Sequence, residues 1–197
     1  MKRFVFTVFF LFSGSVITAH SQALYQTGFE ATENPAFNVG PLPQNGWIQE
    51  SGSAISSVTN GLVFDGSQSL EVAADATISR PLSSSNSSVV YIDGWFKPAR
   101  SREMLDLVGL PASSALFIFQ ATDGIIALDG NGSGGGDWVE TGFTDLDSFI
   151  RLTVLLNFGN HTWNLYANTQ LLEADLGFKD NSINSLAGLR ITSSTEE

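Results

Sequence analysis

The sequence predicts an all-β domain of two packed antiparallel sheets, and three observations lead to this expectation. Helix signals are scarce, whereas runs in which apolar and polar residues alternate recur along the chain. These runs are bounded by Gly, Asn, Ser and Asp, which favour turns. The chain has no cysteine, so burial alone must hold the fold, and its length suffices for one sizeable core. We therefore expect a single domain over residues 24–197.

Residues 1–23 have the pattern of a signal peptide. Lys2 and Arg3 precede an apolar run over 4–12 that is too short to span a bilayer. Ser21 and Ala23 suit cleavage after Ala23, and cleavage after Ser21 is the alternative. The sequence therefore predicts a secreted, periplasmic or cell-surface protein without a membrane span.

The predicted mature chain is strongly acidic. Removing the leader takes two of the nine basic residues and none of the twenty acidic ones, so the formal charge changes from −11 to −13. Such a surface repels phosphate backbones and polyanionic polysaccharides. Nucleic acid is therefore excluded as an expected partner, whereas neutral glycans, cations and proteins stay open.

The clearest strand signal is the run 149–158. Its even-numbered positions are apolar, from Ile150 to Phe158, and most odd-numbered positions after Phe149 are polar. Gly159-Asn160 then forms a turn, and 161–168 returns as the second strand of a hairpin. Further strands are expected at 24–29, 54–59, 66–73, 77–81, 88–97, 115–120, 124–129, 138–141, 170–174 and 186–192. The proline-containing segment 33–44 is expected to be a loop on the outside.

Four short segments carry a resemblance to a known family: Phe29-Glu30, Gly46-Trp47, 66–72 and 163–168. In their order and spacing they resemble the concanavalin A-like, laminin G-like jelly rolls of secreted bacterial proteins. This resemblance implies a two-sheet antiparallel jelly-roll sandwich, with lectin-like ligand binding on the concave sheet or at the loop rim. Such domains commonly finish with an acidic, β-branched strand after the element resembling 186–192. The printed sequence stops at Glu197, which leaves open whether that last strand is present.

The sequence offers no clear catalytic pair. Glucanases of this fold resemble one another in a Glu-x-Asp-x-x-Glu strand, and here Phe178 stands where the second glutamate would follow Glu173 and Asp175. Arg151 and His161 are expected to face each other across the hairpin, but a lyase would need further Arg and Gln residues. We therefore name no catalytic residue and expect no hydrolase or lyase activity.

Tryptophan is the expected sugar-contacting residue type, because its flat ring complements the apolar face of a pyranose. Trp95 and Trp163 lie inside predicted strands and are expected in the core. Trp138 lies beside a glycine-rich loop, so it is the predicted ligand contact.

The same loop matches the oxygen spacing of a calcium site. Asp129, Asn131, Ser133, Asp137 and Glu140 occupy positions 1, 3, 5, 9 and 12, and glycine occupies position 6. A calcium ion is therefore the predicted cofactor, if there is one, and without it the crowded carboxylates would keep the loop open. The alternative is a flexible hairpin connection, because Gly136 replaces the usual apolar residue and strands flank the loop.

The expected function is that of a non-catalytic binding or adhesion module for a neutral polysaccharide or another cell-surface partner. Two alternatives stay open. One is a carbohydrate-active enzyme, a glycoside hydrolase or lyase, whose carboxylates come from distant strands. The other is a structural envelope protein.

Overall fold

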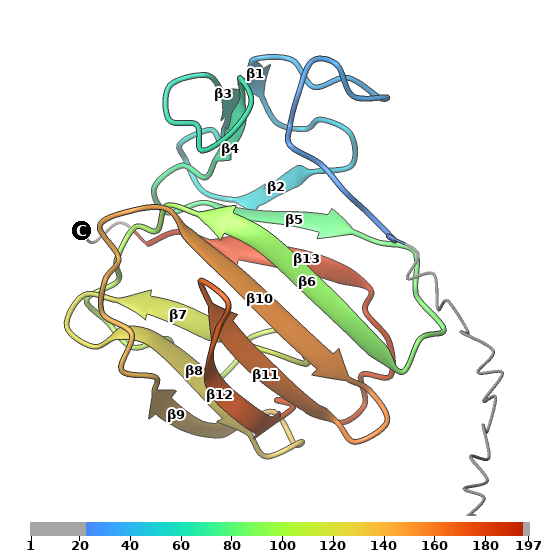
Figure 1. The fold of residues 1–197 in the computed structure, drawn as a ribbon, viewed down its shortest axis with the longest axis vertical. Coiled ribbons are helices and arrows are strands. Elements are labelled where there is room, and N and C mark those ends of the chain that lie inside the picture. The colour runs from blue at the N-terminus through green and yellow to red at the C-terminus, as the bar shows by residue number, and fades with distance from the viewer. Residues whose placement is uncertain (1–22, 195–197) are drawn as a thin grey trace, which may run out of the picture.

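A computed structural model of the chain describes residues 23–194, so residues 1–22 of the predicted signal peptide lie outside the described residues. The described part has thirteen β-strands and no helix (Figure 1), which confirms the all-β prediction, and it therefore contains no helix able to cross a membrane. The strands are β1 (Gly40–Pro41), β2 (Ile48–Ser51), β3 (Ser57–Thr59), β4 (Ser69–Glu71), β5 (Thr77–Pro81), β6 (Val89–Phe96), β7 (Phe117–Gln120), β8 (Gly124–Gly130), β9 (Gly136–Glu140), β10 (Ile150–Asn157), β11 (Thr162–Ala167), β12 (Gln170–Gly177) and β13 (Gly188–Thr192).

The strands form four antiparallel sheets. The largest has the order β12-β11-β10-β6, and the others are β7-β8-β9, β13-β5-β2 and β1-β3-β4. The sheet β12-β11-β10-β6 is called the front sheet below, and β1-β3-β4 the N-terminal sheet. The N-terminal sheet lies above the front sheet in the view of Figure 1.

Two apolar cores hold the sheets together. The larger core joins the inner face of the front sheet to β8, with Leu152, Val154 and Trp163 packed near Ile125 and Ala127. The smaller core joins the N-terminal sheet to β5 and β13, and its buried members are Phe37, Leu42, Trp47, Val58 and Ile78. The architecture is therefore that of packed antiparallel sheets, as the period-two runs predict.

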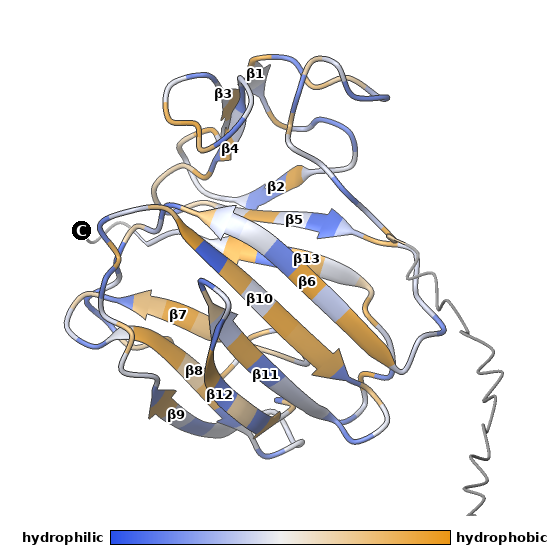
Figure 2. Cartoon of the chain, in the orientation of Figure 1, coloured by the Kyte–Doolittle hydropathy of each residue, from blue (hydrophilic) through white to orange (hydrophobic). Residues whose placement is uncertain are grey.

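The strand β10 shows why the sequence forms a sheet here. Its burial alternates along its whole length, with every even-numbered side chain buried and every odd-numbered one partly exposed. Figure 2 shows the apolar positions along β10 and the neighbouring strands. The predicted hairpin with β11 is confirmed, and its register pairs Leu156 with Trp163.

Several local predictions are wrong. The segment 24–29 forms no strand, and β2 lies where none is expected. The segment 33–44 is not merely an outer loop, because β1 pairs with β3 and the side chains of Phe37 and Leu42 are buried in the smaller core. This proline-containing segment therefore covers the smaller core, and its apolar side chains point into that core.

Candidate functional site

The outer face of the front sheet carries an ordered grid of aromatic and polar side chains. On β6 the outward positions are Tyr91, Asp93 and Trp95, each paired with an outward residue of β10. The partners on β10 are Leu155, Thr153 and Arg151 in that order. The register continues into β11, where Tyr166 pairs with Thr153 and Asn164 pairs with Leu155. Adjacent side chains of this face are therefore about 5 Å apart across strands and about 7 Å apart along them.

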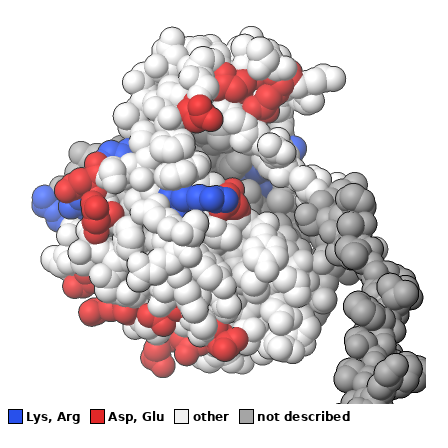
Figure 3. Space-filling view, in the orientation of Figure 1, with Lys and Arg blue, Asp and Glu red and all other residues white. Residues whose placement is uncertain are grey.

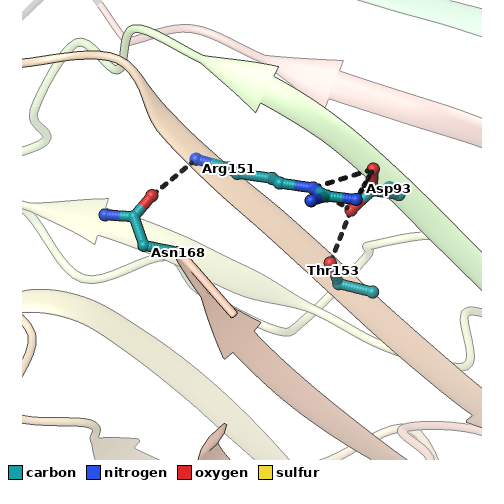
Figure 4. Close-up of polar contacts among 4 residues, drawn as sticks. All are labelled: Asp93, Arg151, Thr153 and Asn168. Carbon is teal, nitrogen blue, oxygen red and sulfur yellow. Dashed lines mark hydrogen bonds and ion pairs between the residues drawn. The ribbon is translucent and has the colours of Figure 1, made fainter. Parts of the chain in front are cut away.

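An ion pair lies in the middle of this grid (Figure 4). The Nε atom of Arg151 donates to both carboxylate oxygens of Asp93 at 3.0 and 3.1 Å, and Nη2 donates to Oδ2 at 3.1 Å. The hydroxyl of Thr153 donates to Oδ1 of Asp93 at 2.5 Å. The Asn168 side-chain oxygen accepts from the backbone N–H of Arg151 at 3.1 Å and so ties the loop after β11 to β10. This network fixes the geometry of the face.

The network also sets the charge state of Asp93. Partial burial acts to raise the pKa of the carboxyl, but the hydrogen bonds from Arg151 and Thr153 and the positive charge of Arg151 outweigh it, so the pKa is lowered. The same contact raises the pKa of Arg151. Both groups are therefore charged over the physiological range, and Asp93 is unsuited to act as a general acid.

This charge state predicts how stability depends on pH. A lowered pKa in the folded protein means that the pair stabilises the fold above the ordinary aspartate pKa of about 3.9 and is lost as the pH falls through the folded value. We expect the difference in Tm between the parent and Asp93→Asn to be constant from pH 5 to 8 and to shrink below about pH 4. Circular dichroism melts at each pH measure this difference. A difference that persists unchanged at pH 2 would show that Asp93 acts through packing instead.

Aromatic rings border the ion pair on three sides. The side chain of Tyr91 is 65% exposed and that of Trp95 is 46% exposed, whereas Tyr166 is partly buried. The ring of Trp95 stacks on Phe64, with ring centroids 3.8 Å apart and planes inclined by 18°. Phe64 comes from the loop 60–68 between β3 and β4, so the N-terminal sheet contributes one aromatic ring to this face.

Glu30 holds the loop that carries Phe64. Its carboxylate accepts hydrogen bonds from the backbone N–H groups of Ser67 and Gln68 at 2.8 and 3.0 Å, and from the hydroxyl of Ser67. These bonds, that from the Ser67 hydroxyl first, lower the pKa of Glu30. Gly66 has a φ of 78°, in the left-handed region that favours glycine, and a Cβ atom there would also overlap with this carboxylate.

The structure separates the predicted tryptophan contact from this face. Trp138 lies on β9, paired with Leu128 of β8, and is partly buried. The core prediction is right for Trp163, whose indole N–H donates to the carbonyls of Leu128 and Gly177 at 3.2 Å each. It is wrong for Trp95, because the even-numbered positions of β6 face the core and residue 95 is odd. The ligand role of Trp138 stays a prediction.

The three acidic residues of the predicted calcium set, Asp129, Asp137 and Glu140, are not gathered at one point, and calcium binding stays a prediction. Asp129 and Asp137 are directly paired between β8 and β9, but Glu140 lies three residues along β9 from Asp137 and hence on the opposite face. Asp129 accepts the backbone N–H of Gly177 at 2.7 Å, and the Asn131 side-chain oxygen accepts those of Ser133 and Gly135. Among residues 23–194 no group of three or more acidic, histidine or cysteine side chains is arranged to hold a metal.

The glycine-rich loop is held by main-chain contacts with the segment after β12. The N–H groups of Gly132 and Gly134 donate to the carbonyls of Phe178 and Lys179 at 2.9 and 2.8 Å. Cβ atoms at Gly130 and Gly177 would overlap with backbone atoms of Phe178 and Gly130 respectively. The expectation of an open loop is therefore wrong, because backbone bonds order it, and its glycines permit this close approach.

Two catalytic hypotheses can be compared with these positions. Arg151 and His161 do not face each other, because Arg151 is at the end of β10 remote from the turn that contains His161. The Nε2 atom of His161 instead lies 3.3 Å from the side-chain oxygen of Asn184. Glu173 and Asp175 lie on β12, where a register shift and the positive φ of Asp175 interrupt the regular alternation.

Comparisons of the chain with family models, curated protein sequences and solved structures found no match. The resemblance to concanavalin A-like jelly rolls therefore stays a prediction. What the fold and the site define is a class: an all-β domain of antiparallel sheets that presents aromatic rings around a fixed ion pair on an open sheet face.

Proposed function

We propose that this protein is an exported, non-catalytic binding module that holds a neutral glycan on the outer face of the front sheet. The observation that carries this proposal is the arrangement of Tyr91, Trp95 and Tyr166 around the Asp93–Arg151 pair. Tyr91 and Trp95 stay largely exposed, Trp95 although it stacks on Phe64, and exposed aromatic area on an ordered face favours a role in binding.

The chemistry of the face matches that of a sugar. Aromatic rings offer apolar area and, in tyrosine, a hydroxyl that bonds to polar groups. Within the described residues, no protein group accepts from Nη1 of Arg151 or from the side-chain NH₂ group of Asn168, so these donors are available to sugar hydroxyls. The rigid ion pair orients them, which reduces the ordering cost of binding.

The charge of the protein favours a neutral ligand. The ion pair on the face is balanced, whereas the chain as a whole has a formal charge of −11. Acidic side chains are spread above and below the face in Figure 3. A polyanionic polysaccharide would be repelled at long range, and a neutral one would not.

The placement of carboxylates supports binding over hydrolysis. Asp93 on β6 and the acidic side chains of β12 are separated by three strand spacings, or about 14 Å. Two carboxyls that flank a scissile glycosidic bond are about 5–10 Å apart. Hydrolysis on this face would therefore need a second carboxyl that the front sheet does not place there.

The test is calorimetric titration with neutral cello-, xylo-, manno- and laminari-oligosaccharides, beside reducing-end assays on the same sugars. We expect binding without turnover. Trp95→Ala should weaken binding at least about tenfold, whereas the matched control Trp138→Ala should change it less than about twofold. Turnover would favour the enzyme alternative, and neither binding nor turnover would favour a structural role. Loss of binding in Trp138→Ala alone would move the site to β9.

A further inference from the structure

The strand β6 is an edge strand, and its backbone pattern shows which groups are unpaired. In the described residues β6 pairs with β10 on one side and with no strand on the other. The N–H of Phe158 donates to the carbonyl of Ser88 at 2.8 Å. In the register of this ladder, the even-numbered residues of β6 are therefore the ones whose backbone groups bond to β10. In an antiparallel pair these positions alternate, so the N–H and C=O groups of Tyr91, Asp93 and Trp95 point away from β10.

These outward backbone groups have no hydrogen-bond partner within residues 23–194. They form a row of three donors and three acceptors, spaced at every second residue. Such a row is a template for one more strand.

The opposite edge of the same sheet is built differently. The strand β12 has register shifts, a positive φ at Asp175, and two acidic residues, Glu173 and Asp175. Bulges and charges of this kind discourage pairing at an edge. β6 has no irregularity of register, and its single charge, Asp93, is neutralised by Arg151. Protection against pairing is therefore present on one edge of the front sheet and lacking on the other.

The surroundings of the β6 edge restrict what can approach. Phe64 from the N-terminal sheet contacts Trp95 at one end of β6. Figure 3 shows a hollow on this face between the upper part of the molecule and the front sheet. A slender extended segment suits this space better than a second folded domain, whose bulk would meet the N-terminal sheet.

The charge of the neighbouring segment indicates the character of the occupant. Residues 23–73, which include the N-terminal sheet, contain no lysine, arginine or histidine. Of their five acidic residues, Glu50 is paired with Arg190 of β13, and the other four are Glu30, Glu33, Asp65 and Glu71. A segment that lies between this part and β6 is favoured when it carries positive charge.

We propose that the edge of β6 binds an extended, basic peptide segment of another polypeptide as an added β-strand of the front sheet. The backbone of Tyr91, Asp93 and Trp95 supplies the hydrogen bonds, and the exposed rings of Tyr91 and Trp95 contact alternate side chains of the peptide. Both roles use the rings of Tyr91 and Trp95, but only the peptide uses the outward backbone groups of β6, so changes to the backbone hydrogen bonds separate the two.

The probe is a synthetic nine-residue peptide in which lysine alternates with valine, labelled with a fluorophore for anisotropy titration. Its control has the same sequence with the amide nitrogens of alternate residues methylated, which removes the donors on one side. We expect the unmethylated peptide to bind and the methylated one to bind at least about tenfold more weakly. Hydrogen exchange by NMR should show new protection of the Tyr91, Asp93 and Trp95 amides, while those of Val90 and Ile92 are protected with or without peptide.

Two variants locate the contact. Tyr91→Pro removes an outward N–H without removing a bond to β10, and Tyr91→Ala removes the ring but keeps the N–H. We expect Tyr91→Pro to bind the peptide at least about tenfold more weakly than Tyr91→Ala. Tyr166→Ala, on β11 and two strands away from the β6 edge, should leave peptide binding intact even where it weakens glycan binding, so failure of either proposal is visible by itself.

Three results would overturn the proposal. Equal binding of the methylated and unmethylated peptides would show attraction by charge alone. Absence of new amide protection at Tyr91, Asp93 and Trp95 with saturating peptide would place the contact elsewhere. Concentration-dependent dimers in analytical ultracentrifugation, abolished by Tyr91→Pro, would mean that a second copy occupies the edge. The peptide controls and the exchange measurement need no variant, so they hold even if Tyr91→Pro does not fold.

Discussion

Leu152→Ala is expected to destabilise the domain by about 2–5 kcal/mol. Leu152 is 2% exposed and lies in the larger core, as the third residue of β10. Its removal loses the transfer free energy of the buried carbons and leaves a cavity, because the surrounding sheets can close only partly. Urea unfolding followed by circular dichroism measures the change in the free energy of unfolding.

Leu155→Ala is the matched control for this prediction. It removes the same atoms from the same strand, but Leu155 lies on the outer face and is partly exposed. We expect a loss of less than about 1 kcal/mol, since only part of the side chain is removed from water on folding. Similar losses for the two variants would contradict the assignment of the inner and outer faces of β10, and with it the position of the proposed site.

Gly177→Ala is expected to destabilise the domain by about 3 kcal/mol, although it adds one methyl group. The backbone of Gly177 does not have the positive φ that alanine disfavours, so the effect comes from contact alone. The new Cβ would overlap with the carbonyl oxygen of Gly130, a backbone atom that cannot rotate away. The approach of β12 to the end of β8 would have to widen, with loss of the bond between Asp129 and the N–H of Gly177.

Gly61→Ala separates this contact from the general effect of replacing glycine. Gly61 is exposed, lacks a positive φ, and a Cβ atom there would meet only the hydroxyl of Thr59 at 3.4 Å. We expect its stability to change by less than about 1 kcal/mol, and a small gain is compatible with reduced freedom of the unfolded chain. Thermal melts of the two variants beside the parent give the comparison. A stable Gly177→Ala protein would mean that the glycine-rich loop is not held as described.

The fold could be predicted where alternation was long. The run from Phe149 to Phe158 predicts both the strand and its buried face, because every even-numbered position from 150 to 158 is apolar and a helix has no such period. Short strands were harder to predict from the sequence. The strand β1 has two residues, and its pairing with β3 depends on burial of Phe37 and Leu42, which holds the segment 33–44 against the smaller core. No local pattern reports such a tertiary contact.

The candidate site was missed, although part of its signal was present in the sequence. In the predicted strand 88–97, Val90, Ile92 and Phe96 share one face, and the same alternation puts Trp95 on the other face. Trp95 was nevertheless predicted to lie in the core, because tryptophan is usually buried and its position within the strand was given less weight. The Asp93–Arg151 pair could not be predicted from the sequence, because the two residues are 58 positions apart and meet only through the register of β6 and β10.

For the calcium hypothesis, the sequence contained a ligand-like pattern that the strand pairing does not bring together. The spacing of oxygen-bearing residues over 129–140 fits a ligand loop, but the same residues also form two strands and a turn. Pairing of Asp129 with Asp137 places successive residues on alternate faces, so linear spacing no longer means a common centre. The glycines, which suggested flexibility, instead serve contacts with Phe178 and Asn181.

The central claim, that a neutral glycan binds the outer face of the front sheet, is tested most directly by the four tryptophan indole signals in an NMR spectrum. Trp47 and Trp163 are buried, Trp138 lies on β9, and Trp95 lies on the proposed face. We expect titration with a neutral oligosaccharide that binds to shift the indole signal of Trp95 and to leave the other three in place. A shift of Trp138 with Trp95 unchanged would contradict the claim.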